Sequence, residues 1–176
     1  APDVRAQALV AGRLDATTLS LGTWATIQHQ PGVKVLVNAD DYYAAAPINL
    51  KINAATTKTI KDKPEQLRRF SAAVMKTSRA FAGSEDTWVN AMLKSRPDLK
   101  RADLEELWPQ FKPAWAANGL MNLDQYQKTS DYLFQTSDFK GVPQIQVSDW
   151  TDTQFVDSVL GQIGVDPNLD PIGRKI

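Results

Sequence analysis

The chain of 176 residues contains no cysteine and a single histidine, His29. The missing cysteines exclude disulfides, thiol catalysis and cysteine-based metal sites, and they are compatible with an oxidising compartment. Long hydrophobic runs are also missing, so no membrane-spanning segment is predicted. The chain also lacks an excess of positive or negative charge, because 20 basic residues balance 20 acidic ones. Net charge therefore gives no indication of a nucleic-acid or polyanion partner.

Signatures of catalysis are equally scarce. The sequence has no glycine-rich phosphate loop, no paired catalytic carboxylates and no nucleophile elbow. His29 lies late in a predicted helix, before Pro31 and Gly32, which suits a surface residue near the negative helix end. With no second histidine and no cysteine, a metal site is not expected. We therefore predict no catalytic residues, no metal and no cofactor.

Three short apolar segments suggest strands within the first 53 residues. Residues 14–19 (LDATTL) and 33–37 (VKVLV) are rich in β-branched side chains, and residues 48–53 (INLKIN) alternate apolar and polar ones. Isolated strands leave backbone groups unpaired, which is costly. We therefore expect an α/β fold with an incomplete sheet, completed by a missing N-terminal half, a second copy or a partner chain.

Helix signals surround and follow these segments. One helix is predicted over residues 3–11, ended by Gly12, and another starts at Ser20. From residue 54 onwards the chain is expected to be almost entirely helical. A long helix should run from Pro64 to Gly83. Its predicted apolar face consists of Leu67, Phe70, Val74 and Phe81. Later helices are predicted to begin at the capping residues Ser84, Asn122 and Thr151.

An ordered set of motifs resembles the C-terminal half of periplasmic substrate-binding proteins of ABC importers. The closest group is the sulfonate-, nitrate- and taurine-binding type, including NMT1/THI5-like binders of thiamine precursors. The motifs are ALVAGRLDA (8–16), SLGTW (20–24), GVKVLV (32–37), KPEQLRRFSAAVMKTSRAF (63–81), AANGLMN (116–122) and DW with FVD (149–157). The resemblance implies a type II periplasmic-binding-protein-like α/β fold with a helix-rich C-terminal portion. Residues 1–53 would end lobe two and supply the hinge crossover strand, and residues 54–176 would close lobe one.

The same resemblance implies a function. The chain would be the periplasmic, or extracellular and membrane-tethered, solute-binding component of an ABC transporter. It would capture a small organic anion (a sulfonate, nitrate, taurine or an aromatic acid) between two lobes and present it to a membrane permease. One alternative is a binding protein or biosynthetic enzyme for a thiamine-pyrimidine precursor on the same fold. Another is a structural or interaction module.

The first candidate ligand site follows the predicted strand at residues 14–19. In open α/β sheets, ligands lie beyond the carboxyl ends of strands, where helix N-termini favour anions. Thr18, Ser20, Thr23 and Trp24 occupy that position. Thr23 would donate a hydrogen bond and Trp24 would form an apolar wall. The alternative is that Ser20 is only a helix cap and Trp24 only a core residue.

A second group of candidates follows the predicted strand at residues 33–37. The adjacent Tyr42 and Tyr43 would lie on a loop, where one ring could stack on a ligand or offer its hydroxyl. Packing between lobe and hinge is the alternative. Asn49 lies on the predicted crossover strand and is expected to reach the cleft.

Overall fold

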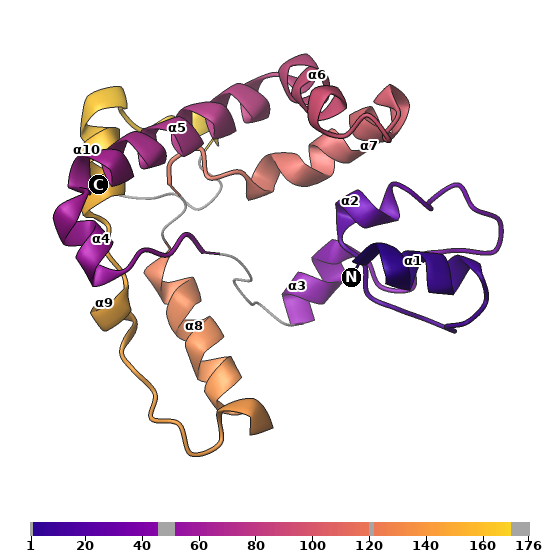
Figure 1. The fold of residues 1–176 in the computed structure, drawn as a ribbon, viewed down its shortest axis with the longest axis horizontal. Coiled ribbons are helices and arrows are strands. Elements are labelled where there is room, and N and C mark those ends of the chain that lie inside the picture. Colours follow the sequence, from indigo (N-terminus) through magenta and orange to yellow (C-terminus); the bar gives the residue numbers. More distant parts are fainter. Residues whose placement is uncertain (1, 46–51, 120–121, 170–176) are drawn as a thin grey trace. The chain divides into compact units, whose positions relative to one another are not determined.

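The computed structural model describes residues 2–45, 52–119 and 122–169, and helices dominate these ranges (Figure 1). The α-helices are α1 (Pro2–Val10), α2 (Leu21–Trp24), α3 (Ala39–Ala45), α4 (Thr57–Asp62), α5 (Pro64–Gly83), α6 (Glu85–Ser95), α7 (Arg101–Phe111), α8 (Leu123–Phe134), α9 (Val147–Trp150) and α10 (Gln154–Ile163). Short 3₁₀ turns are η1 (Lys112–Ala114), η2 (Ser137–Phe139) and η3 (Pro167–Leu169). No helix within the described ranges is long and apolar enough to cross a membrane.

The predicted α/β fold is wrong, because the described residues contain no strand. Residues 14–19 and 33–37 are irregular, and Leu36 is 74% exposed. A β-branched run becomes a strand only when a neighbouring strand completes its hydrogen-bond ladder and covers one face. Neither segment has such a neighbour in the described ranges. Of the third predicted strand, residues 48–51 lie outside the described residues, and residues 52–53 are irregular. The type II periplasmic-binding fold is not supported.

The chain forms two compact units. The first unit comprises residues 1–37 and 80–114, and the second comprises residues 38–79 and 115–176. Helix α5 contributes to both, with its first sixteen residues in the second unit. The boundary that the sequence suggested at residue 53 stays a prediction.

Helices α6 and α7 pack side by side in the first unit (Figure 1). Trp88 and Val89 of α6 and Leu104 and Leu107 of α7 are buried, as their helical spacing favours. Ser84 caps α6 as predicted, because its hydroxyl oxygen accepts a hydrogen bond from the Thr87 backbone N–H at 3.2 Å.

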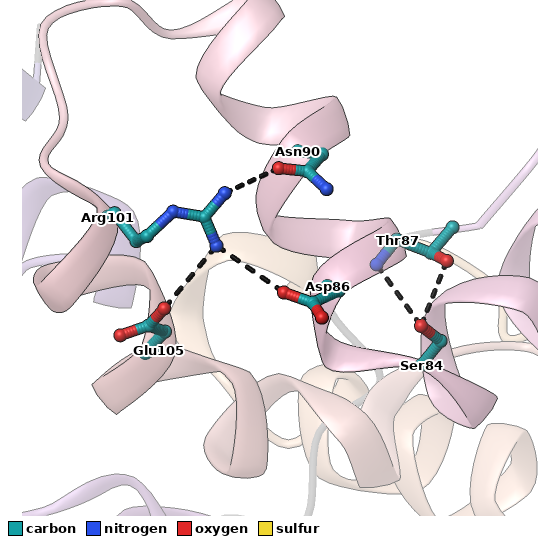
Figure 2. Close-up of polar contacts among 6 residues, drawn as sticks. All are labelled: Ser84, Asp86, Thr87, Asn90, Arg101 and Glu105. Carbon is teal, nitrogen blue, oxygen red and sulfur yellow. Dashed lines mark hydrogen bonds and ion pairs between the residues drawn. The ribbon is translucent and has the colours of Figure 1, made fainter.

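Polar contacts join the same two helices at their surface (Figure 2). Arg101 Nη2 donates to Asn90 Oδ1 at 2.5 Å, and Arg101 Nη1 lies 3.5 Å from Asp86 Oδ1 and 3.4 Å from Glu105 Oε1. The arginine thereby connects α7 to two successive turns of α6. Because these groups are exposed, each ion pair contributes little free energy, and the contacts chiefly fix the orientation of the helices.

The end of α1 is correctly predicted at Gly12. Its φ of 67° lies in the left-handed region that glycine adopts without a steric penalty. The Gly12 N–H donates to the Leu9 carbonyl at 3.0 Å, and the Arg13 N–H donates to the Ala8 carbonyl at 2.8 Å. This pair of bonds is a Schellman motif, which satisfies carbonyls that the helix end leaves free.

The core of the second unit lies between α5 and α10. Met75 packs with Val159 and Leu160, and the partly buried side chains around them are Ala72, Val156, Ile163 and Val165. The predicted apolar face of α5 is partly wrong, since Phe70 is 50% exposed. Met75 and the partly buried Ala72 face the core instead.

Arg79 links the far end of α5 to two other segments of the second unit. Its guanidinium donates to the carbonyl oxygens of Ala117 at 2.9 Å and Gly164 at 2.6 Å, and to Asn118 Oδ1 at 2.8 Å. Asn118 is 2% exposed, and its side chain also bonds both backbone groups of Asp166. Arg79 thus satisfies a carbonyl beyond the end of α10 and holds the turn at residues 117–119.

The starts of α8 and α10 give one confirmed cap and one correction. Asn122 Oδ1 accepts the Gln125 N–H at 3.0 Å, as the capping signature predicts. Thr151 does not cap α10, because its hydroxyl donates back to the Val147 carbonyl at 2.9 Å. The Gln154 N–H is accepted by Asp152 Oδ1 at 3.0 Å instead.

Candidate functional site

An open groove of about 470 Å³ lies between α5 and α10 in the second unit. Its floor and walls combine aliphatic side chains with cationic ones. The lining residues are Arg68, Arg69, Ala72, Ala73, Lys76, Val159, Gln162 and Ile163. Within the described part of the chain, this lining holds no carboxylate. A volume of this size is within the range of small-molecule sites in proteins.

Arg68 is fixed at one edge of the groove. Its Nε and Nη2 atoms donate to the two carboxylate oxygens of Glu65 at 2.8 and 2.6 Å, and its Nη1 donates to Gln162 Oε1 at 3.2 Å. The hydrogen bond from Arg68 lowers the pKa of Glu65, burial opposes it, and the charges of Arg68 and Arg69 lower the pKa further. The same contact raises the pKa of Arg68. Three of the five guanidinium N–H donors are therefore already in use.

Arg69 and Lys76 are both exposed, and neither forms an ion pair or a hydrogen bond with another described residue. They stand seven residues apart on α5, so they lie on the same side of the helix, two turns from each other. Together with the Arg68–Glu65 pair they leave the groove with a formal charge of +2. The site can attract an anion and pack its apolar part against alanine, valine and isoleucine side chains.

Metal binding is not supported in the described ranges, which contain no group of three or more histidine, cysteine, aspartate or glutamate side chains suited to a metal ion. The groove itself presents cations, which repel a metal ion. The arrangement offers electrostatic binding and apolar contact.

The first predicted ligand site forms a local turn in the first unit. Thr18 is exposed and accepts a hydrogen bond from Arg5 Nη1 at 3.2 Å. The Ser20 and Thr23 hydroxyls lie 3.0 Å apart, and Ser20 Oγ also accepts the Thr23 N–H at 3.3 Å. Thr23 is buried and Trp24 is half-buried. The hydroxyls thus bond each other at the start of a helix of only four residues. Ligand contact by these residues stays a prediction.

The other predicted site residues are less completely placed. Tyr42 lies on α3 in the second unit and is exposed, so its position is helical rather than in the expected loop. Tyr43 lies on the same helix, and its side chain is outside the described residues. Asn49 also lies outside the described residues. Asn38 stabilises the start of this helix, because its Oδ1 accepts the Asp41 N–H at 2.9 Å.

His29 is at the surface, as predicted, but α2 ends at Trp24, so the histidine lies in the turns that follow rather than late in a helix. It has a specific partner. Its Nε2 lies 3.0 Å from Oδ1 of Asp103, whose side chain is largely buried in the first turn of α7. The pair fastens the segment after α2 to α7 within the first unit. This contact accounts for the histidine as a structural residue.

No protein-family model, curated protein or solved structure matches the chain. The resemblance to periplasmic substrate-binding proteins therefore stays a prediction from its motifs. Sequence reasoning also missed the groove. The available signal was the alanine pair at residues 72–73, flanked by Arg69 three residues before it and Lys76 three residues after it. On a helix, this spacing places small side chains between two cations on one side.

Proposed function

We propose that this chain binds a small organic anion in the groove between α5 and α10. The observation that carries the proposal is the combination of three cationic side chains with an aliphatic floor and no carboxylate in the described lining. An ordinary solvated surface would carry cations without the aliphatic lining, and a packed apolar core would contain no cations. The two together match a ligand with an acidic group and a hydrophobic body.

The two side chains that are free for an incoming ligand differ in chemistry. Arg69 offers a planar fork of donors that fits a carboxylate or sulfonate with two parallel hydrogen bonds. Lys76 offers a compact charge on a flexible stem. Arg68 contributes its positive field while its donors stay on Glu65 and Gln162. The groove therefore attracts anions broadly and orients those whose acidic group presents two oxygens to the fork of Arg69.

We also propose a setting for this binding. The ordered motifs at residues 8–16, 63–81 and 116–122 support a role as the solute-binding component of an ABC importer, in the periplasm or tethered outside the cell. In that role the chain would present the anion to a membrane permease, without chemical change to it. This setting rests on sequence motifs, whereas the binding site rests on the groove.

A ligand panel tests the proposal. Thermal unfolding of the purified chain would be followed with benzenesulfonate, benzoate, taurine, nitrate and a neutral pyrimidine, with benzenesulfonamide as the uncharged match to benzenesulfonate. A ligand that binds only the folded chain raises its unfolding temperature in proportion to the logarithm of its concentration. We expect the anions with an apolar body to give the largest shifts. A shift with the pyrimidine alone would favour the thiamine-precursor alternative, and no shift with any anion would overturn the proposal.

A further inference from the structure

We infer that the preferred ligand of the groove carries two anionic ends joined by an apolar spacer, as an aliphatic dicarboxylate does. This inference rests on the proposed function and names its ligand class. The evidence is the placement of Arg69 and Lys76 at opposite ends of the alanine pair at residues 72–73.

The separation of the two cations sets the length of the ligand. Seven residues of α-helix correspond to a rise of about 10 Å, so Arg69 and Lys76 leave the helix two turns apart. A ligand with one acidic group can hold both side chains only if they bend toward each other. An extended ligand with two acidic ends can contact both along α5 without that bending.

The surface between the two cations suits an aliphatic spacer. Ala72 and Ala73 project only methyl groups there, and the partly buried Ile163 of α10 adds an apolar side chain to the same lining. A polar or charged spacer would lose hydration against these side chains without gaining a hydrogen bond from them. An extended methylene chain would bury apolar surface instead.

Arg68, the third cation of the groove, does not add to its uncompensated charge. Arg68 is held on both oxygens of Glu65 and on Gln162, so its charge is largely compensated. The uncompensated charge of the groove is +2, carried by Arg69 and Lys76. A ligand with two negative charges neutralises it, whereas a ligand with one leaves one cation unmatched.

Calorimetric titration with a matched pair of ligands tests the inference. Suberate has two carboxylates, and monomethyl suberate has the same chain with one. We expect suberate to bind about fivefold more tightly, because an exposed ion pair contributes up to about that factor. Malonate, which is too short to bridge the cations, should bind no more tightly than monomethyl suberate.

Single substitutions test whether Arg69 and Lys76 each bind one carboxylate of suberate. R69Q and K76Q should each reduce the preference for suberate over its monomethyl ester to about onefold. K128Q removes an exposed cation of α8 outside the groove, and it should keep the preference. Circular dichroism would confirm that all variants fold.

The possible failures are distinguishable. Equal affinities for suberate and its monomethyl ester, both lost in the R69Q/K76Q double variant, would overturn the two-ended ligand and leave the anion-binding proposal intact. A suberate preference that survives in K76Q would overturn the pairing with Lys76. No binding of either compound, or of benzenesulfonate, would overturn both proposals.

Discussion

The guanidinium of Arg68 holds both carboxylate oxygens of Glu65, with Nε–Oε2 and Nη2–Oε1 distances of 2.8 and 2.6 Å. The two residues are one helical turn apart on α5, at the edge of the cationic groove. Glu65 therefore occupies donors that would otherwise be available to an incoming anion. Its negative charge also reduces the attraction that the groove exerts.

Replacement of Glu65 by Gln should strengthen anion binding. The variant removes one negative charge beside the groove and releases Arg68, and we expect benzenesulfonate to bind up to about fivefold more tightly. Isothermal titration calorimetry measures the change. The matched control is E105Q, which removes a carboxylate from Arg101 in the first unit and should leave the affinity unchanged. Weaker binding by E65Q would show that Glu65 supports the site rather than competing with the ligand.

Acidification should also strengthen anion binding, because protonation of Glu65 removes the same negative charge beside the groove. Arg68 lowers the pKa of Glu65, and Arg96 lowers the pKa of Asp98 through its hydrogen bond. A lowered carboxyl pKa gives a stabilising contribution that is present above the ordinary pKa and is lost as the pH falls through the lowered value. NMR titration of the side-chain carboxyl carbons should place Glu65 below its ordinary range in the wild type and closer to it in R68Q. Identical titration curves in the two proteins would contradict this result.

Local signals predicted much of the helical structure. Gly12, Ser84 and Asn122 end or begin helices where the sequence indicates, because each acts on the backbone within a few residues. The strands failed for the opposite reason. The VKVLV segment at residues 33–37 has the composition of a strand, but strand formation depends on a partner far away in the sequence or in another chain.

The candidate site was harder to predict than the helices. Arg69 and Lys76 look like ordinary solvated residues of an amphipathic helix, and only the approach of α10 adds an apolar side chain to the lining around the alanine pair between them. That approach depends on packing across more than eighty residues of chain. Asp152 shows the same limit on a smaller scale, since its carboxylate accepts the first N–H of α10 where the signature had pointed to Thr151.

Arg79 should be important for the stability of the second unit. R79Q removes a charged donor from the carbonyls of Ala117 and Gly164 and from Asn118, and we expect a loss of about 2 kcal/mol in the free energy of unfolding. Urea denaturation followed by tryptophan fluorescence measures this loss. The exposed Arg13 offers a comparison, because R13Q should change stability by less than about 0.5 kcal/mol. Equal effects of the two variants would contradict the role of Arg79.

The packing of α6 against α7 gives a second stability test. Leu104 is fully buried at 0% exposure, and L104A should cost about 2–5 kcal/mol through lost burial and a residual cavity. Leu123 begins α8 and is 42% exposed, so L123A removes the same atoms at a much smaller cost. Differential scanning calorimetry compares the two. A comparable fall in unfolding temperature for both would show that Leu104 is not in a packed core.

The most direct test of the anion-binding account is a calorimetric titration of benzenesulfonate into the wild type and the R69Q/K76Q double variant. We predict saturable binding to the wild type and to the K128Q control, and no detectable binding to the double variant at the same concentrations. Retention of wild-type affinity by a folded double variant would contradict the account, because the anion would then bind somewhere other than the groove between α5 and α10.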